Sequence, residues 1–500
     1  MPHNIIPLIV AIPLAAAFVN SLIGKKVKGF SDALSALATF SLAVISIFAV
    51  ILFKENGVMV YKVGGWAPPI GIAMVIDGLT AFMLVTINVI AFFISIYSID
   101  YMKKYTEKWV FYCLFLLMVA GMNGVIISGD MFNLYVFLEI AAISSYALVA
   151  FGTEHEELEA SFKYAVMGTV ASSFILLGIV FLYGITSTLN MADMSMALLE
   201  GGSPRIVLLV SVLFLMGFGL KSALVPFHAW LPDAHPSAPA PISAMLSGVL
   251  IKSLGVYAMV RIFFSVLGIT PEISSVLMML GALSMIFGVF LALGQWDMKR
   301  LLAYHSISQI GYVALGIGLG TPLGILGGLF HLFNHSVFKS LLFLNSGAVE
   351  YATGTKDLQK MGGLKERMPV TGATSLIASM SIAGIPPFNG FWSKLIIIVA
   401  CIEAQHFAYA FWAVLASILT LSSFMKVQRY GFFGELKEKL NQIKEVPFFM
   451  KVSMIALAVI CVVGGALLLP VVAGDFLNVA RDTVLAGQDY ITAVFGAIGK

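Results

Sequence analysis

The chain has 500 residues, of which 60% are hydrophobic and only 11% are charged, and its mean hydropathy is +0.98. Soluble domains carry about 25% charged residues, so a water-soluble fold of this length could not cover its surface. The net charge of +3 is small, and the basic residues fall in short loops rather than on one face, which excludes a nucleic-acid-binding protein.

Apolar runs long enough to cross a bilayer, about 20 residues each, recur along the whole sequence. In the first half they lie near 5–23, 31–53, 73–97, 109–128, 130–152 and 161–184. In the second half they lie near 205–231, 239–262, 271–294, 300–319, 321–347, 369–405, 408–430 and 450–471. The sequence therefore predicts an all-α integral membrane protein with about 14 transmembrane helices.

The first run lacks a basic leader and is followed, not preceded, by Lys25, Lys26 and Lys28. This is the wrong polarity for a cleaved signal peptide, so we expect a retained span with the N-terminus outside. In that orientation most loop lysines and arginines, Lys299 among them, face the cytoplasm. The outer side carries only Lys54, Lys62, Arg205, Arg261, Arg481 and Lys500. This asymmetry supports both the orientation and an even number of spans.

Two runs contain prolines that break a helix. The seventh carries Pro226 and Pro232 and continues as a proline-rich re-entrant segment, and the twelfth is too long for one straight helix and contains Pro386 and Pro387. Backbone that is not helical at membrane depth is tolerated only where protein or water satisfies it. The two segments resemble each other in a Pro-Phe pair followed by an aromatic residue, which points to an internal repeat and to a transport site.

Ionisable residues also lie inside the predicted spans. Glu139 sits in the middle of its run without a cation next to it in sequence, and burying a lone carboxylate costs several kcal/mol. We expect Lys221, which comes just before the predicted break, to be its partner. Each member of such a pair changes the pKa of the other.

Lys252 lies in the centre of the eighth run, and Lys394 follows the break in the twelfth. An ammonium group in a dry environment holds its proton less tightly, which suits a group that loads and releases protons near neutral pH. His331 and His335 are spaced four apart, so they share a helix face, and histidine is a natural proton relay. These residues predict a buried line that moves protons or small cations.

Several of these side chains have an alternative interpretation. The pair His331 and His335 also fits a metal site or a contact between helices, although no third ligand is evident. Lys339 either belongs to the line or snorkels to the cytoplasmic interface. His305, at the start of its run, is either a relay residue or part of the charged loop next to it.

Other polar residues fit structural roles. We expect Asp77 to cap a helix and the acidic residues 154–159 to form a solvated face. Each of the three cysteines, Cys113, Cys401 and Cys461, stands alone in an apolar run, which is typical of packing residues. The sequence has no cysteine set for iron–sulfur clusters and no dinucleotide fingerprint. We therefore expect no cofactor and no bound metal, and no electron transfer through this chain.

Five segments together resemble the antiporter-like subunits shared by respiratory complex I, membrane-bound hydrogenases and Mrp-type cation/proton antiporters. They are Phe137-Leu138-Glu139-Ile140, the stretch from Lys221 to His235, the stretch from Asp297 to Gly311, the stretch from His331 to Lys339, and the stretch from Gly384 to Lys394. Lys394, the last residue of the fifth segment, and the Ala-Tyr-His-Ser-Ile-Ser-Gln-Ile-Gly stretch look most like the D-type subunit of an Mrp antiporter.

The resemblance implies about 14 transmembrane helices with discontinuous helices 7 and 12 and two inverted five-helix repeats. The N-terminal spans 1–3 would occupy residues 1–108, the first repeat 109–262, the second repeat 271–430, and the last span with the C-terminal tail 450–500. Glu139 and Lys221 would gate proton loading, Lys252 with His331 and His335 would form the middle relay, and Lys394 would exchange protons with the far side.

The sequence thus predicts a proton-translocating subunit of a multisubunit Na⁺/proton antiporter in a prokaryotic cytoplasmic membrane. Its partners would be other membrane subunits, the bilayer, protons and Na⁺. A second interpretation is a proton-pumping subunit of a complex I-type oxidoreductase or a membrane-bound hydrogenase, in which other subunits transfer the electrons. A third is a membrane scaffold with inert polar helices. In the first two cases the chain is a transporter subunit rather than a catalyst on its own.

Overall fold

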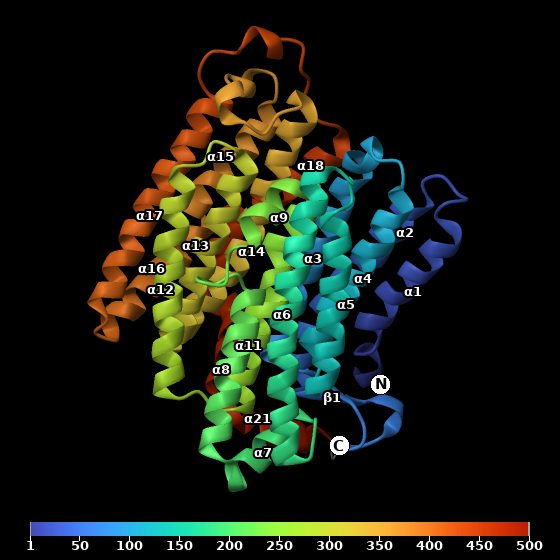
Figure 1. Ribbon diagram of the computed structural model, residues 1–500, viewed down its shortest axis with the longest axis vertical. Helices are drawn as coiled ribbons and strands as arrows, with labels where there is room; N and C mark the ends of the chain where they lie inside the picture. Colours follow the sequence, from blue (N-terminus) through green and yellow to red (C-terminus); the bar gives the residue numbers. More distant parts are fainter. Residues whose placement is uncertain (1, 499–500) are drawn as a thin grey trace.

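The computed structural model describes residues 2–498 as a bundle of long helices that run side by side along the long axis of the molecule (Figure 1). Both ends of the chain lie at the same end of the bundle, close to the strand β1 (Met59–Lys62). This placement agrees with an even number of spans. Lys500, which the charge asymmetry assigns to the outer side, lies outside the described residues.

The N-terminal part contains helices and one small hairpin, in which β1 pairs antiparallel with β2. The third predicted run begins too early, because its first residues form β2 and the helix starts only after Asp77. The elements are η1 (Pro2–Ile5), α1 (Leu8–Ile23), α2 (Phe30–Asn56), β1, η2 (Val63–Gly65), β2 (Ala73–Ile76), α3 (Gly78–Tyr101) and η3 (Met102–Lys104).

The middle of the chain contains the first predicted break. The seventh run is helical to Lys221, leaves the helix over residues 222–230, and resumes as the short helix α9. The elements are α4 (Lys108–Ile127), α5 (Met131–Val149), α6 (His155–Thr186), α7 (Met191–Gly201), α8 (Pro204–Lys221), α9 (Leu231–Ser237), α10 (Ala240–Met245), η4 (Leu246–Leu250), η5 (Lys252–Tyr257), α11 (Ala258–Val260) and η6 (Arg261–Val266).

The second half contains the other predicted break, between α15 and α16. Gly384 ends α15 at a φ of 79°, a conformation that glycine adopts without steric cost. The elements are α12 (Pro271–Leu293), α13 (Met298–Gly318), α14 (Pro322–Thr353), η7 (Leu358–Lys360), η8 (Leu364–Glu366), α15 (Pro369–Ala383), α16 (Asn389–Glu403), α17 (Phe407–Val427), η9 (Gln428–Phe432), η10 (Glu438–Leu440), α18 (Phe448–Val463), η11 (Gly464–Leu468), α19 (Pro470–Ala473), α20 (Leu477–Leu485), η12 (Gly487–Asp489) and α21 (Tyr490–Ile498).

The helix starts follow local sequence signals. Asp130 caps α5 and Asp297 caps α13 through their side chains, and Thr270 and Thr321 do the same for α12 and α14. Proline occupies the first turn of α8, α12, α14 and α15, where its missing N–H costs nothing. These caps explain why the predicted runs and the helices agree so closely.

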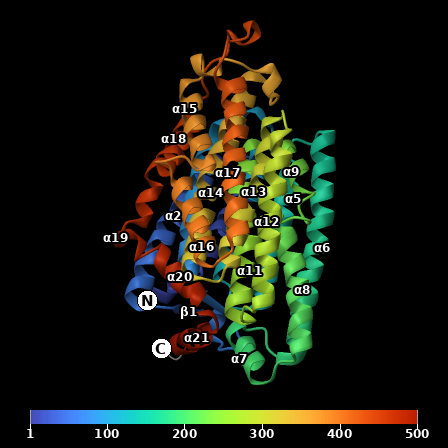
Figure 2. The ribbon, with the colours of Figure 1, turned by 90° about the vertical axis from the view of Figure 1, so that its left-hand side faces the viewer.

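Among the described residues, ten helices are long and apolar enough to cross a membrane, which makes this an all-helical, multi-pass membrane protein. The helices α13 and α14 are as long but more polar, and nearly all their residues are buried. The window within 240–266 is 100% buried. In the view turned by 90°, α6 and α8 lie at one edge of the bundle and α13 and α14 lie in its interior (Figure 2). Polar side chains are thus concentrated on helices shielded from lipid.

At the end near the termini, Asp77 does more than cap α3. It accepts a hydrogen bond from the Thr80 amide at 2.9 Å and pairs with Arg261 at 2.6 Å, and both side chains of the pair are only 2% exposed. The guanidinium of Arg261 also lies 5.1 Å from the ring of Tyr490 in α21. The charge count assigns Arg261 to the outer side, and the structure places it at the end of the bundle near the termini, but its side chain is buried and is not a loop charge. The buried pair ties three distant segments together.

This pair predicts a large stability effect. Arg261→Gln leaves the Asp77 carboxylate buried without its cation, so we expect the free energy of unfolding to fall by about 3–5 kcal/mol. Chemical denaturation of the purified protein measures this loss. Lys54→Gln is the control, because its pair with Asp475 is largely exposed and should contribute much less. Equal losses in the two variants would contradict the assignment.

Candidate functional site

The structure brings the predicted partners Glu139 and Lys221 together. Glu139 lies on α5, Lys221 is the last residue of α8, and their side chains approach to 3.9 Å between Oε1 and Nζ. The hydroxyl of Ser172 also donates to Oε1 of Glu139, and the hydroxyl of Tyr146 lies 3.4 Å from the lysine Nζ. Lys221 is 5% exposed and Glu139 is 26% exposed. The lysine is therefore held inside the bundle, and the carboxylate lies at its rim.

Lys252 lies deep in the bundle, at the start of the π-helical turn η5. Its ammonium donates to the backbone carbonyl of Ser247 in the preceding π-helical turn η4. The hydroxyl of Ser247 is 2.7 Å from that of Ser306 on α13. A π turn shifts the backbone bonding pattern and is frequent at functional positions. Here it gives a buried cation a carbonyl partner instead of a carboxylate.

The two histidines on α14 differ in their surroundings. His331 has partners for both ring nitrogens, with Nδ1 at 2.9 Å from the hydroxyl of Ser393 and Nε2 at 3.2 Å from Oε1 of Gln309. His335 is fully buried, and within the described chain neither of its ring nitrogens has a hydrogen-bond partner. The ring centroids are 6.3 Å apart. Over residues 2–498, no group of three or more His, Cys, Asp or Glu side chains is placed to hold a metal ion.

Lys394 lies one turn after the second helix break. Its Nζ donates to the carbonyl of Ile382 at 2.8 Å, lies 3.4 Å from the hydroxyl of Ser417, and is 4.8 Å from the ring centroid of Tyr312. The carbonyl of Ile382 belongs to the end of α15. A cavity of about 250 Å³ between α16 and α17 reaches Lys394 and Ser417. The second break thus positions a buried ammonium beside an opening.

Lys339 and His305 are both buried. Lys339 is 0% exposed and donates to the carbonyl of Leu302 on α13, so the prediction that it snorkels to the interface is wrong. His305 is also 0% exposed, and its Nε2 is 2.8 Å from the hydroxyl of Ser423. Both residues therefore belong to the interior rather than to the charged loop.

The buried groups are close enough to act on one another. Lys394 and Lys252 both act electrostatically on His331, and the same two lysines together with Lys339 act on His335. Tyr312 lies between His331 and Lys394, with its ring centroid 5.4 Å from that of His331. Tyr312 contacts both His331 and Lys394, and Lys252 lies near enough to act on the histidine pair. The structure therefore gathers these buried polar groups in one region of the interior.

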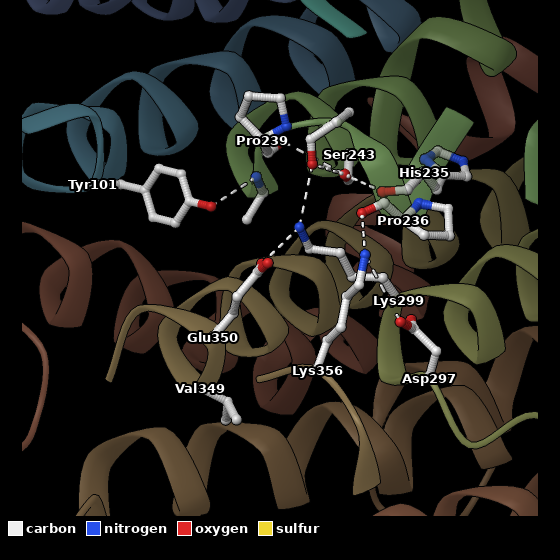
Figure 3. A network of polar contacts seen from close by, with 12 residues as sticks. Tyr101, His235, Pro236, Pro239, Ser243, Asp297, Lys299, Val349, Glu350 and Lys356 are labelled. Carbon is white, nitrogen blue, oxygen red and sulfur yellow. Dashed lines mark hydrogen bonds and ion pairs between the residues drawn. The ribbon is translucent and has the colours of Figure 1, made fainter. Parts of the chain in front are cut away.

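Sequence reasoning missed two members of the interior. Lys299, assigned to a cytoplasmic loop, is 2% exposed and pairs with Glu350 at 2.7 Å (Figure 3). His235 is 0% exposed, and neither ring nitrogen has a hydrogen-bond partner among residues 2–498. Both lie in segments that the resemblance already marked, from Asp297 to Gly311 and from Lys221 to His235. Membership of these segments was the sequence signal that could have identified both residues. Hydropathy alone does not distinguish a buried charge from a loop charge at the end of an apolar run.

Comparison with protein-family models gives two matches. Residues 128–420 match the model described as "NADH:quinone oxidoreductase/Mrp antiporter, TM". Residues 66–112 match the model described as "NADH-Ubiquinone oxidoreductase (complex I), chain 5 N-terminus". Every predicted site residue lies within the first match.

Curated relatives come from both branches of this group. The chain is 35% identical to the D subunit of the Na(+)/H(+) antiporter of Alkalihalophilus pseudofirmus over 441 residues, which are 88% of this chain and 89% of the relative. It is 37% identical to the N subunit of the NADH-quinone oxidoreductase of Desulforudis audaxviator over 428 residues, which are 85% of this chain and 84% of the relative.

Solved structures also come from two kinds of complex. A chain of the Mrp complex from Dietzia sp. superposes with a TM-score of 0.90 at 27% identity and with 99% of both chains covered. A chain of the membrane-bound sulfane sulfur reductase, an archaeal respiratory membrane complex, superposes with a TM-score of 0.90 at 32% identity, covering 98% of this chain and 99% of that one. The fold therefore occurs in multisubunit membrane complexes of different kinds.

The close packing at the second break predicts a steric effect. A Cβ added at Gly390, in the first turn of α16, would overlap the carbonyl oxygen of Ser381 on α15. We expect Gly390→Ala to lower the free energy of unfolding by about 1–3 kcal/mol, as measured by chemical denaturation. Gly184→Ala is the control, since no described atom lies within 4 Å of its added Cβ. An unchanged free energy of unfolding in Gly390→Ala would mean that α15 and α16 pack less closely at the break than the structure shows.

Proposed function

Because this chain belongs to the family of antiporter-like membrane subunits shared by NADH:quinone oxidoreductases and Mrp antiporters, we propose that it translocates protons as a subunit of a multisubunit Na⁺/proton antiporter. The observation that carries the proposal is the set of lysine ammonium groups buried at membrane depth, with Lys252, Lys339 and Lys394 bonded to backbone carbonyls and not to carboxylates. Ionisable side chains at such positions mark transport pathways.

The proposed roles follow the order of the buried groups. Glu139 and Lys221 form the loading pair, and Lys252 with His331 and His335 passes the proton on. Lys394, beside its cavity of about 250 Å³, exchanges it with the far side. Lys339 and His305 are additional members of the buried line. The membrane potential contributes about 2.3 kcal/mol per charge per 100 mV, which is enough to change the occupancy of a lysine more than tenfold.

The proposed topology has 14 spans with both chain ends outside. Two inverted repeats occupy 109–262 and 271–430, each containing one broken helix, and they are flanked by the spans of 1–108 and by the last span with its tail in 450–500. The matching positions of the two breaks support this division. The protein would lie in a prokaryotic cytoplasmic membrane together with other membrane subunits, protons and Na⁺.

A second candidate is a proton-pumping subunit of a redox complex. It is favoured by the likeness to the N subunit of an NADH-quinone oxidoreductase and to a chain of the sulfane sulfur reductase. In that case, electron transfer in other subunits would drive the same buried line. The proton-transfer residues would be unchanged, but the source of energy would differ.

The loading pair gives a test of proton translocation. In the assembled complex, Lys221→Ala and Glu139→Ala should each lower proton flux by about 100-fold or more, because each removes one half of a coupled pair. The double variant should be no worse than either single variant, since the pair acts as a unit. Flux in membrane vesicles is the measurement, and Lys54→Ala, on an exposed pair, is the control. Normal proton flux in both single variants would contradict proton translocation by this pair and would favour the interpretation of the chain as an inert scaffold.

The driving ion separates the two candidates. In vesicles that carry the intact complex, an imposed Na⁺ gradient should drive proton movement, and Lys394→Ala should abolish that movement because the exchange with the far side is lost. Proton flux that does not depend on Na⁺ but depends on added electron donors would contradict antiport and favour the redox complex. Complex assembly, measured in the same membranes, controls for loss of the variant protein.

A further inference from the structure

We propose that the ion pair of Lys299 and Glu350 gates proton uptake from a cavity at the predicted cytoplasmic end, and that His235 is the buried group to which this inlet delivers the proton. This inference rests on the proposed function and deepens it, because it names an inlet for the buried line. Neither residue of the pair nor His235 belongs to the line that the sequence predicts.

The cavity lies where the start of α6, the end of α14 and the re-entrant segment after α9 meet. It has a volume of about 370 Å³ and is lined by Glu154, His155, Glu156, Glu157, Pro236, Ser237, Glu350 and Lys356. A neighbouring cavity of about 340 Å³ shares Pro236, Ser237 and Lys356 and adds Asp233 and Asp297. The acidic residues 154–159 are mostly exposed, as expected for a solvated face, and they also line this recess and its neighbour.

Glu350 separates this recess from the interior. Its side chain is 26% exposed, and its Oε2 pairs at 2.7 Å with Nζ of Lys299, which is only 2% exposed. The same Nζ donates to the carbonyl of Ala238 at 3.2 Å. Lys356 donates to the nearby carbonyl of Pro236 over 3.1 Å (Figure 3). The pair thus connects the end of α14 to the re-entrant backbone and closes the recess toward the interior.

His235 lies behind the closed pair. Its carbonyl accepts from the hydroxyl of Ser243 at 2.8 Å, whereas its two ring nitrogens have no hydrogen-bond partner in the described part of the chain, although the residue is 0% exposed. Burying an imidazole whose two nitrogens have no hydrogen-bond partner costs free energy unless a proton or water reaches it. The charged groups that act on it are Lys339, Lys252 and Lys299. His235 is therefore close enough to act electrostatically with Lys299 of the gate and with Lys339 and Lys252 of the buried line.

The charges around Glu350 set its resting state. Burial would raise the pKa of Glu350, but Lys299, together with Lys104 and Lys356, outweighs burial and holds the pKa below its ordinary value. Tyr101 lies near enough to act electrostatically on this carboxylate, while its hydroxyl accepts from the Ala240 amide. Glu350 is therefore negative near neutral pH, and the pair is closed at rest.

Two other carboxyl groups, one in the recess and one in the neighbouring cavity, behave in the opposite way. Burial raises the pKa of Glu157 and also that of Asp297. Each therefore binds a proton at a higher pH than a free carboxylate does. Glu157 belongs to α6 and lines the recess, whereas Asp297 precedes α13 and lines the neighbouring cavity.

The gating step transfers one proton. The only covalent bonds that form or break are the bonds to this proton. A proton from the water of the recess binds the Glu350 carboxylate and neutralises it, while Lys299 keeps its charge and loses its counter-ion. The pair opens, and water carries the proton from the Glu350 carboxyl to a free ring nitrogen of His235. Glu350 is then a carboxylate again and the pair closes behind the proton.

The test uses the full complex in inverted vesicles, which expose the cytoplasmic face to the medium. Proton uptake is measured as a function of the external pH. Glu350→Gln and His235→Gln should each lower uptake by about 100-fold, and Glu350→Gln should also remove the dependence on external pH. Glu350→Asp keeps a titratable carboxyl, so it should restore pH-dependent uptake to within about tenfold of the unaltered protein.

A matched control lies on the same face. Asp357 pairs with Lys360 at 3.5 Å, and the two side chains are 33% and 72% exposed, so Asp357→Asn should leave uptake and its pH profile unchanged. Equal losses in Glu350→Gln and Glu350→Asp, with an unaltered pH profile, would show a structural role and overturn the gate.

Lys221→Ala in parallel separates this inference from the proposed function. If Lys221→Ala abolishes uptake while Glu350→Gln and His235→Gln behave as Asp357→Asn does, the gate is wrong and the proposed function stands. If Lys221→Ala also leaves uptake intact, the proposed function itself fails and the inlet fails with it.

Discussion

The structure depends on how a lysine ammonium group is held where there is no bulk water. A charged side chain in a medium of low dielectric constant needs partners for its N–H groups, and here backbone carbonyls supply them. Lys252 uses a carbonyl of a π-helical turn, and Lys394 uses a carbonyl at the end of the broken helix α15. Irregular or terminal backbone therefore stabilises two of the buried cations, whereas Lys339 uses a carbonyl of the regular helix α13.

Carbonyl partners differ from carboxylate partners in what happens when the proton leaves. A lysine paired with a buried carboxylate would leave an uncompensated anion behind, whereas a lysine bonded to a carbonyl leaves neutral groups. Lys252, Lys339 and Lys394 are of the second kind. The pair of Asp77 and Arg261 is the opposite case, because arginine does not deprotonate in proteins. One arrangement permits titration, and the other fastens segments together.

The sequence predicted what depends on local pattern. Run lengths located the helices, and the prolines around Pro226 and Pro387 located both breaks. The lack of a cation next to Glu139 predicted a partner on another helix, and Lys221 lies beside it. The predictions that failed concern residues at the ends of apolar runs. Arg261 and Lys299 were predicted to be loop charges, but both side chains are buried. Whether such a residue faces water is decided by packing against segments far away in sequence, namely α21 and the end of α14.

The positions of the two openings have a mechanical consequence under the proposed function. The recess at Glu350 borders the re-entrant segment that follows the first break, and the cavity at Lys394 borders the second break. Each break thus supplies one opening, while His331 and His335 lie on the unbroken helix α14 between them. A continuous helix transmits a proton through side chains without moving its own backbone, so backbone movement can be confined to the breaks. Under the proposed function, movement at one break would then change access at that break alone, and coupling between the two breaks would pass through the charges on the buried line.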